Sequence, residues 1–483
     1  MTTNTSTGTC RDSCFDVAVI GAGPAGLSAA ASAAAAGAAT ICIDGQRRPG
    51  GQYYRQPAGA AAASADRRQR SGAALYEAAV NAGSGYLPGT GVWGLSEDPH
   101  TTAVRRVELV TDGRLSQVSA RSIVVAAGAR ERCAAFPGWT LPGVLTAGGV
   151  QALYKQHRIV PGKRILLAGS GPLLLVVAAA MARAGGEVAA VVEAARVGGH
   201  SLRHPWSTTA TMVRQPAKIW EGARSVAALA RHGVRVRTGW GVVQAHGRTE
   251  VTGATIARLD RQWRPVPGTH RYLDCDTIAI HHGLVPATEM LQLLGVPLSY
   301  QPALGGHVPV RDDTMATDAA GVFAAGDGAG VGGAGLALVE GEIAGAAAAA
   351  HALGTPYSTA DLTRSQRVRL RRERRFQKHY SELFRSRPGL ADLAGPDTPL
   401  CRCENVPERE VSAAINAGAT TVTAVKSLTR CGMGNCQGRV CAPLIQDCLT
   451  RHLGPPPEQP PPLRARTPLE PVPLSAFASE AGP

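Results

Sequence analysis

The chain has 483 residues, 44% of them hydrophobic, so several globular domains with buried cores are expected. Its formal net charge is +14, but only 4% of residues are aromatic, and no basic patch interleaved with aromatics indicates a nucleic-acid partner. The first 14 residues are polar and show no export signal, which predicts a cytoplasmic protein.

The segment from Phe15 to Asp44 has the pattern of a βαβ unit that binds a dinucleotide. An apolar strand leads into a Gly-x-Gly-x-x-Gly turn, an Ala-rich helix follows, and a second strand ends in an acid. The glycines allow a tight turn, close approach of a pyrophosphate and close helix packing, and the acid can accept ribose hydroxyls. The residues expected at this site are Gly21, Gly23, Pro24, Ala25, Gly26 and Asp44.

The same pattern recurs from Gly162 to Glu193, where Leu174 replaces the third glycine. Glu193 favours a ribose over a 2′-phosphate, so NAD is one candidate ligand. The alternative is a scaffold whose site is empty or holds only an adenylate such as ATP. The apolar run 165–182 within this unit is broken by Gly-Ser-Gly-Pro, so we expect a buried strand and helix and no transmembrane segment.

Three later segments complete the expected architecture. A strand near 314–325 ends in Gly326 and Asp327, where a carboxylate can bind a polyol, and a small-residue helix follows. The stretch 364–387 holds ten Arg or Lys, with Phe376, Tyr380, Leu383 and Phe384 spaced as the buried stripe of an amphipathic helix. The Pro-rich end, from residue 454 onward, is expected to lie extended on a surface or on a partner.

The cysteines are concentrated near the end of the chain. Six of the 11 lie between 401 and 448, and an odd total without an export signal argues against a disulfide framework. Within the first 400 residues no Cys-x-x-Cys or Cys-x4-Cys pair is present, so disulfide reduction is set aside. The terminal group leaves a [2Fe–2S] cluster, zinc or no metal open.

The strings "GGQYYRQ", "GARERCAAFPGWTLPGVLTAGGVQAL", "DTIAIHHGLVPATEMLQLLGV" and "TRCGMGNCQGRVC" resemble one branch of the two-dinucleotide-domain flavoproteins. This branch contains the FAD-bearing subunits of hydrogen cyanide synthase, opine oxidase, and D-hydroxyproline and L-proline dehydrogenases. The resemblance implies an α/β fold of glutathione-reductase type with two Rossmann-like domains and a small helical [2Fe–2S] domain. It also implies FAD bound by the residues named above together with Gly51, Gln52, Ala127, Gly128, Gly326 and Asp327.

The resemblance also implies domain boundaries. They are 14–155 and 290–352 for a split FAD domain, 156–289 for an inserted second nucleotide-binding domain, 353–395 for a basic helical linker, 396–452 for the cluster domain and 453–483 for the tail.

The terminal cysteines resemble the bacterioferritin-associated ferredoxin type of [2Fe–2S] domain. That type has Cys-x-Cys, a gap of about thirty residues and a second short pair. From Cys403 to Cys436 there are 32 intervening residues, whereas Cys431 as the third ligand would leave 27. The expected ligands are therefore Cys401, Cys403, Cys436 and Cys441, with Cys431 as the open alternative.

By resemblance, the chain is one subunit of an amine or imino-acid dehydrogenase complex that relays electrons from a partner to an external acceptor. The implied partner is an amino-acid-oxidase-like flavoprotein subunit. Further candidates are an FMN at a subunit interface and a small ferredoxin-like subunit. The acceptor would place the protein in the cytoplasm or at the inner face of the membrane. Two alternatives remain: an NAD(H)-dependent ferredoxin-type reductase that acts alone, and a scaffold that transfers no electrons. The sequence names no catalytic residue.

Overall fold

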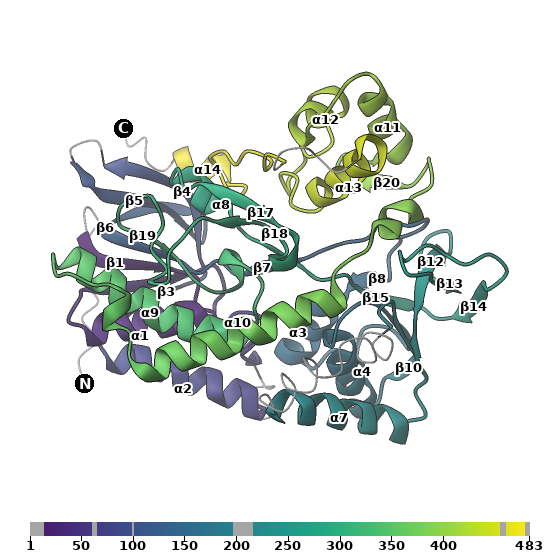
Figure 1. The fold of residues 1–483 in the computed structure, drawn as a ribbon, viewed down its shortest axis with the longest axis horizontal. Helices are drawn as coiled ribbons and strands as arrows, with labels where there is room; N and C mark the ends of the chain where they lie inside the picture. Colours follow the sequence, from purple (N-terminus) through teal and green to yellow (C-terminus); the bar gives the residue numbers. More distant parts are fainter. Residues whose placement is uncertain (1–13, 60–64, 99–100, 197–215, 455–459, 479–483) are drawn as a thin grey trace.

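The computed structural model describes residues 14–59, 65–98, 101–196, 216–454 and 460–478, without the side chains of 101–103 and 216–219. Figure 1 shows two sheet-containing bodies side by side, with a small helical domain beside them. This arrangement is the α/β class that the repeated βαβ pattern predicts.

The first sheet holds seven strands. Six of them lie in the order β3-β2-β1-β6-β5-β4, and the seventh, β19, pairs with the C-terminal end of β6. The strands β3, β2, β1, β6 and β19 run parallel, while β4 and β5 form an antiparallel extension of β6. The core strands β1 and β2 are apolar and buried on both faces, as parallel strands between helices are. The strands are β1 (Cys14–Ile20), β2 (Thr40–Asp44), β3 (Gly85–Pro88), β4 (Thr90–Asp98), β5 (Thr101–Thr111), β6 (Arg114–Val125) and β19 (Val322–Ala324).

Helices α1 (Pro24–Ala35) and α9 (Ala334–Ala352) pack against each other on one face of this sheet. Helix α2 (Arg67–Asn81) packs on α1, and the short α8 (Glu289–Leu293) packs against β4 near the opposite core. Because β19 at residues 322–324 joins strands that lie within residues 14–125, the first sheet is built from two separate parts of the chain.

The second sheet is all parallel, in the order β11-β10-β9-β15-β8. Helices α3, α4 and α7 bury apolar side chains against it, and a small antiparallel sheet, β12-β13-β14, lies beside it. The elements are β8 (Val144–Thr146), α3 (Ala147–His157), β9 (Arg164–Gly169), α4 (Leu173–Arg183), β10 (Glu187–Glu193), α7 (Pro216–Arg231), β11 (Val236–Thr238), β12 (Trp240–His246), β13 (Gly253–Arg258), β14 (Arg271–Asp274) and β15 (Thr277–His281).

The position of β8 changes one expected boundary. β8 pairs with β15 of the second sheet, and Ala147 and Val150 of α3 lie in the second core. Residues 144–157 therefore pack with the second sheet, whereas the expected boundary placed residues up to 155 in the FAD domain. The cause is a long-range strand pairing, which local sequence patterns do not encode.

Several remaining elements are short. They are β7 (Ala129–Glu131) with β16 (Leu284–Pro286), β17 (Leu298–Gln301) with β18 (Gly306–Pro309), and the 3-10 turns Pro302–Leu304, Gly326–Ala329, Thr359–Asp361 and Pro388–Leu393.

The basic stretch forms one long helix, α10 (Arg364–Phe384), that runs in front of both bodies in Figure 1. Thr363 caps its N-terminus and accepts a hydrogen bond from the Gln366 N–H at 3.1 Å. The predicted aromatic stripe is only half-buried, and the fully buried positions lie beside it. They are Gln366, Leu370, Glu373 and Gln377.

The cluster domain contains β20 (Pro399–Cys401), β21 (Val406–Pro407), α11 (Glu408–Asn416), α12 (Val422–Thr429) and α13 (Cys441–Leu453). The two short helices α11 and α12 pack together, since Val411 and Ile415 share a core with Val422 and Val425. This core is continuous with that of the second unit. The indole N–H of Trp139 donates to the Pro399 carbonyl at 2.7 Å, which ties the two together.

Residues 460–478, here called the C-terminal strap, run from the cluster domain back to the first sheet (Figure 1). The Leu469 N–H donates to the Trp93 carbonyl at 2.7 Å, and the Gln437 amide donates to the Pro468 carbonyl at 2.7 Å. The strap ends in α14 (Leu474–Ala478), where Phe477 packs edge-on against Trp93. The described part of the Pro-rich end, residues 460–478, thus lies on the chain's own surface.

The apolar run 165–182 folds as β9 and α4, as predicted. Among the described residues, none of the helices combines the length and the apolar character needed to cross a membrane.

Candidate functional site: a dinucleotide cradle and a cysteine chamber

The glycine turn after β1 has the shape that a dinucleotide needs. A Cβ on Gly26 would lie 1.6 Å from the Gly21 carbonyl oxygen, so only glycine lets α1 start this close to the strand. A Cβ on Gly23 would meet nothing nearer than the Gly51 Cα at 4.0 Å, which leaves space above the turn. Helix α1 begins with Pro24 and has no side-chain cap, so its first N–H groups are available to an anion.

Asp44 ends β2 beside this turn, and its carboxylate is buried. One oxygen accepts from the Gln46 N–H at 3.1 Å, while the other, Oδ2, has no hydrogen-bond partner in the described structure. Burial raises the pKa of Asp44 to about 6, against the lowering effects of the Gln46 and Ala22 N–H groups and of Arg55. A buried oxygen without a donor fits the ribose hydroxyl that the fold would place there.

A second helix N-terminus approaches from β19. Asp327 Oδ1 accepts from the Gly332 and Gly333 N–H groups at 2.9 and 2.8 Å, just before α9 starts. Helix α9, like α1, has no side-chain cap. Burial raises the pKa of Asp327, and the two N–H groups oppose that shift.

Glycines bring the N-terminal halves of α1 and α9 together. A Cβ on Gly341 would lie 2.1 Å from the Ala25 carbonyl oxygen, and one on Gly345 would lie 2.2 Å from that of Ala29. Both contacts are with backbone atoms, which cannot rotate away. The packing therefore places the start of α1 against α9 about two turns from the α9 N-terminus, so both uncapped N-termini lie in the same part of the first body, where their dipoles favour a pyrophosphate.

The sequence reasoning missed Glu340, which fixes the Gly326 turn. Glu340 is 1% exposed and accepts from the Gly326 N–H at 3.0 Å. Its carboxylate also pairs with Arg311, at 2.7 and 3.1 Å. The available signal was a pair of acids, Glu340 and Glu342, in a helix made mostly of small and apolar residues.

Of the other residues predicted to bind the dinucleotide, Gly51, Ala127 and Gly128 lie around the glycine turn, and Gln52 is the exception. Gly51, at φ 58°, would place a Cβ 2.9 Å from the Gly23 Cα, so the 50–54 loop touches the glycine turn. Gly128, at φ 71°, faces open space after β6 and directly follows Ala127. The Gln52 side chain is exposed, and its carbonyl accepts from Lys155 at 3.3 Å. Burial lowers the pKa of Lys155 to about 8.

In the second βαβ unit the chain already uses the donors of the glycine turn. The Glu193 carboxylate accepts from the Gly171 N–H at 2.9 Å and from the Ala195 N–H at 2.8 Å. Burial raises the pKa of Glu193, and these N–H groups oppose the shift.

Helix α10 lies over the same turn. A Cβ on Gly171 would be 3.3 Å from the Tyr380 hydroxyl, and the Ser170 hydroxyl donates to the Phe384 carbonyl at 3.4 Å. Loss of solvent, followed by the charges of Glu193 and Asp327, raises the pKa of the Tyr380 phenol. Tyr380 thus lies between the acids of the two nucleotide units.

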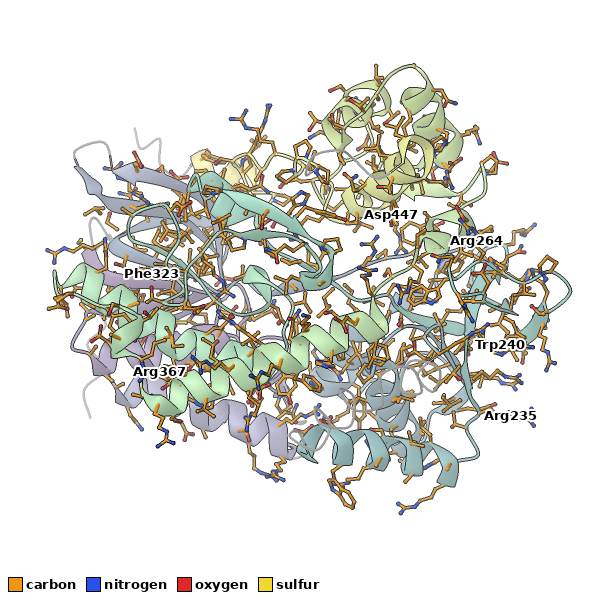
Figure 2. The ribbon with its side chains drawn as sticks, viewed as in Figure 1. Arg235, Trp240, Arg264, Phe323, Arg367 and Asp447 are labelled. Carbon is orange, nitrogen blue, oxygen red and sulfur yellow. The ribbon has the colours of Figure 1, made fainter. Side chains whose placement is uncertain are left out.

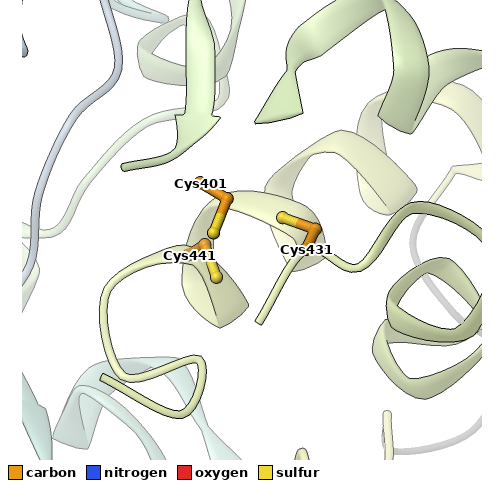
Figure 3. A group of neighbouring side chains, drawn as sticks. All are labelled: Cys401, Cys431 and Cys441. Atoms are coloured by element: carbon orange, nitrogen blue, oxygen red, sulfur yellow. The ribbon is translucent and has the colours of Figure 1, made fainter. Parts of the chain in front are cut away.

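The cluster domain brings five cysteines together in one group, here called the cysteine chamber: Cys401, Cys403, Cys431, Cys436 and Cys441. The sulfurs of Cys401, Cys431 and Cys441 lie within 4.8 Å of one another, and all three residues are buried (Figure 3). Hydrogen bonding with Cys431 and burial raise the pKa of the Cys441 thiol. Two of the expected ligands are therefore in this trio, together with the cysteine that the spacing argument left out.

Cys403 and Cys436 form a second pair at the same site. Desolvation acts to raise the pKa of Cys436, but hydrogen bonds to its sulfur from Val440, Cys403, Gly438 and Arg439 outweigh it and lower the pKa. The N–H groups of a loop that converge on one sulfur are typical of thiolates that bind iron–sulfur clusters. Geometry alone favours Cys431 as a ligand, whereas these donors favour Cys436.

An ion pair holds the cysteine chamber against the rest of the chain, and an apolar cavity lies beside it. Arg132 donates to Asp447 of α13 at 2.6 Å, and Figure 2 labels Asp447 on the side of the domain that faces the other units. An apolar cavity of about 420 Å³ lies between α3, Trp139 and Arg402, the residue between the first two cysteines.

Comparison with known proteins supports both the dinucleotide-binding body and the cysteine-containing domain. Residues 15–352 match the family model of the pyridine nucleotide-disulphide oxidoreductases, and residues 399–451 match that of the BFD-like [2Fe-2S] binding domain. Ten cysteines are described and all are free thiols, so the described part shows no disulfide of the kind the first family name mentions.

Curated relatives cover almost the whole chain. The HcnB subunit of hydrogen cyanide synthase from Pseudomonas aeruginosa is 31% identical over 95% of this chain and 97% of its own. The A subunit of opine oxidase from Agrobacterium tumefaciens is 31% identical over 96% of this chain and 91% of its own. The alpha subunit of sarcosine oxidase from a Corynebacterium species is 26% identical, over 61% of this chain and 29% of its own.

A solved structure shows the same fold. L-proline dehydrogenase from P. horikoshii superposes with a TM-score of 0.69 over 97% of this chain and 80% of its own, at 18% identity. Together with the buried Asp44, the paired helix N-termini and the cysteine chamber, these matches identify the chain. It is an FAD-dependent oxidoreductase of the pyridine nucleotide-disulphide oxidoreductase family, in the branch of HcnB and the opine oxidase A subunit, and it carries a BFD-like [2Fe-2S] domain.

Proposed function

We propose that the chain is the electron-accepting subunit of an amine or imino-acid dehydrogenase complex. An amino-acid-oxidase-like flavoprotein subunit supplies the electrons, which this chain passes to an external acceptor. The observation that carries the proposal is the docking of a cysteine chamber onto a dinucleotide-binding body within one chain. A bound flavin would accept electrons in pairs, and a [2Fe–2S] cluster would pass them on singly.

The chain's own residues fit both groups. Asp44 offers an unpaired carboxylate oxygen to a ribose, and α1 and α9 offer uncapped N–H groups to a pyrophosphate. At the cluster we propose Cys401, Cys403, Cys436 and Cys441 as ligands, because residues 399–451 match the BFD-like [2Fe-2S] binding domain and the 32 residues between Cys403 and Cys436 fit its spacing.

The substrate class rests on the relatives. Subunits of hydrogen cyanide synthase and of opine oxidase match more than nine-tenths of this chain. We propose a substrate with a CH–NH or CH–NH2 bond, among which glycine, opines, proline and hydroxyproline are the candidates to assay. Three further features stay predictions. They are the small ferredoxin-like subunit, FMN at an interface, and a cytoplasmic or membrane-peripheral location. The apolar cavity beside Arg402 could receive a planar group such as a flavin ring.

The alternative of a reductase that acts alone on NADH is disfavoured by α10. A pyrophosphate needs close approach to Gly171 and its N–H, but Tyr380 covers the glycine and Glu193 accepts from the N–H. We propose that this unit serves as scaffold and does not feed electrons from pyridine nucleotide.

The test reconstitutes the purified chain with its amino-acid-oxidase-like partner and follows amine-dependent reduction of an external dye. We expect activity with the wild-type chain, loss of activity with Cys401→Ala, and full activity with the control Cys448→Ala, a buried cysteine outside the chamber group. A full rate with Cys401→Ala would instead support the scaffold without electron transfer. Rapid bleaching of the flavin by NADH in the chain alone would contradict the proposal.

A further inference from the structure

The chamber holds one more cysteine than a [2Fe–2S] cluster uses, since four thiolates bind the two irons. With Cys401, Cys403, Cys436 and Cys441 as ligands, the extra residue is Cys431. Its sulfur nevertheless lies within 4.8 Å of those of Cys401 and Cys441 (Figure 3). The inference below rests on the proposed cluster and concerns what this fifth thiol does.

The backbone directs Cys431 into the chamber. Helix α12 ends at Arg430, which has a left-handed conformation with φ 63°, and the Cys431 N–H then donates to the Thr429 hydroxyl at 3.2 Å. Cys431 is 0% exposed. Burial alone does not explain its place, because Cys448 is equally buried in the same domain and lies outside the group.

Cys436 lies on the same loop but is held differently. It is partly exposed, and its carbonyl oxygen accepts from the Arg439 N–H at 3.0 Å. The loop that carries the two cysteines also contains Gly432 and Gly438, both with positive φ, at 94° and 83°. One short loop thus offers two sulfurs to the same chamber, one sealed inside and one nearer the solvent.

We propose that Cys431 is an alternative cluster ligand that exchanges with Cys436, while Cys401, Cys403 and Cys441 stay bound. In the exchange, an iron–sulfur bond to Cys431 forms as the bond to Cys436 breaks. The proton released by the Cys431 thiol passes to the departing Cys436 thiolate, so neither the charge of the cluster nor its oxidation state changes. The exchange lets the chain keep its cluster when the more exposed Cys436 is oxidised or alkylated.

The experiment uses the full chain, reconstituted anaerobically with iron and sulfide. Four variants are compared with the wild type: Cys431→Ala, Cys436→Ala, the double variant, and the control Cys448→Ala. The readouts are iron and acid-labile sulfide per chain and the electron paramagnetic resonance spectrum of the reduced protein.

We expect about two irons per chain in both single variants and in the control. Cys431→Ala should keep one set of g values and Cys436→Ala should show another, because the ligand set differs. The double variant should hold at least tenfold less iron per chain than the wild type. Equal iron loss in Cys436→Ala and the double variant would overturn the proposal.

Flavin content and circular dichroism show whether each variant folds, and Cys436→Ser provides a second substitution if the alanine variant does not. A wild-type chain that takes up zinc but no iron or sulfide would refute the proposed cluster itself. That result differs from a wild type that loads normally beside an iron-free Cys436→Ala, which would refute only the exchange.

Discussion

The contact between α1 and α9 gives the sharpest test of the flavin site. In Gly341→Ala, the added Cβ would lie 2.1 Å from the Ala25 carbonyl oxygen, more than 1 Å inside an ordinary contact. The obstacle is backbone, so α9 must move away from α1. Overpacking of this kind costs about 3 kcal/mol, of which the better helix propensity of alanine returns about 1, so we expect a net loss of about 2 kcal/mol.

The matched control is Gly222→Ala. Gly222 lies within α7, and a Cβ there would meet nothing within 4 Å. This substitution should therefore stabilise the chain by about 1 kcal/mol, through helix propensity alone. The two variants make the same chemical change and should have effects of opposite sign.

The assay is denaturant unfolding of the FAD-loaded chain, followed by flavin fluorescence and by circular dichroism. Because a shift of α9 separates two helix N-termini, Gly341→Ala should also bind FAD about tenfold more weakly, as a titration of the FAD-free chain would show. If Gly341→Ala proved as stable as Gly222→Ala and held FAD as tightly as wild type, the packing argument would be wrong.

Three further outcomes are expected. FAD affinity should fall by up to about tenfold for each pH unit below about 6, because burial raises the pKa of Asp44 to about 6 and the protonated acid accepts ribose hydroxyls poorly; Asp44→Asn should remove this dependence in fluorescence titrations at several pH values. The same raised pKa means that the folded chain binds this proton more tightly than the unfolded chain, so this site's contribution to the stability of the FAD-free chain should rise as pH falls toward 4. Tyr380→Ala should gain measurable NADH binding by calorimetry, whereas Tyr272→Ala, which changes an exposed tyrosine in the same unit, should bind no better than wild type. Leu469→Ala should destabilise the strap by about 2 kcal/mol and speed its proteolysis, and Leu474→Ala, at a side chain 86% exposed, should not.

Local patterns were sufficient for the cradle. The strand, the glycine turn and the acid at the end of the next strand are contiguous in sequence, so Gly21, Gly26 and Asp44 could be named from the sequence alone. Their assignment as FAD ligands stays a prediction, although the unpaired Asp44 oxygen is what that assignment requires.

Long-range packing explains what could not be predicted. Tyr380 covers Gly171 although the two are 209 residues apart, and no local pattern in either segment indicates that contact. The same holds for the pairing of β8 with β15 and for the ion pair of Glu340 with Arg311. The partial burial of the α10 stripe follows as well, because the helix packs on α9 along a neighbouring face.

The cysteine chamber lies between these cases. Spacing favours Cys436 over Cys431, and the N–H groups on Cys436 support that choice. Spacing could not reveal that the turn after α12 would bring Cys431 beside Cys401 and Cys441, since the left-handed residue at Arg430 sets that direction.

The C-terminal strap gives the order in which the molecule can be assembled on the ribosome. The strands of the first sheet that the strap contacts are synthesised early. The cysteines emerge before residues 460–478 do. The cluster domain can therefore fold and take up metal while it is still tethered only on its N-terminal side. Emergence of residues 460–478 then lets Leu469 reach Trp93 and close the second tether. A chain cut short before these residues would lack that tether, and its cluster domain would be held by the shared core and the Trp139 and Arg132 contacts alone.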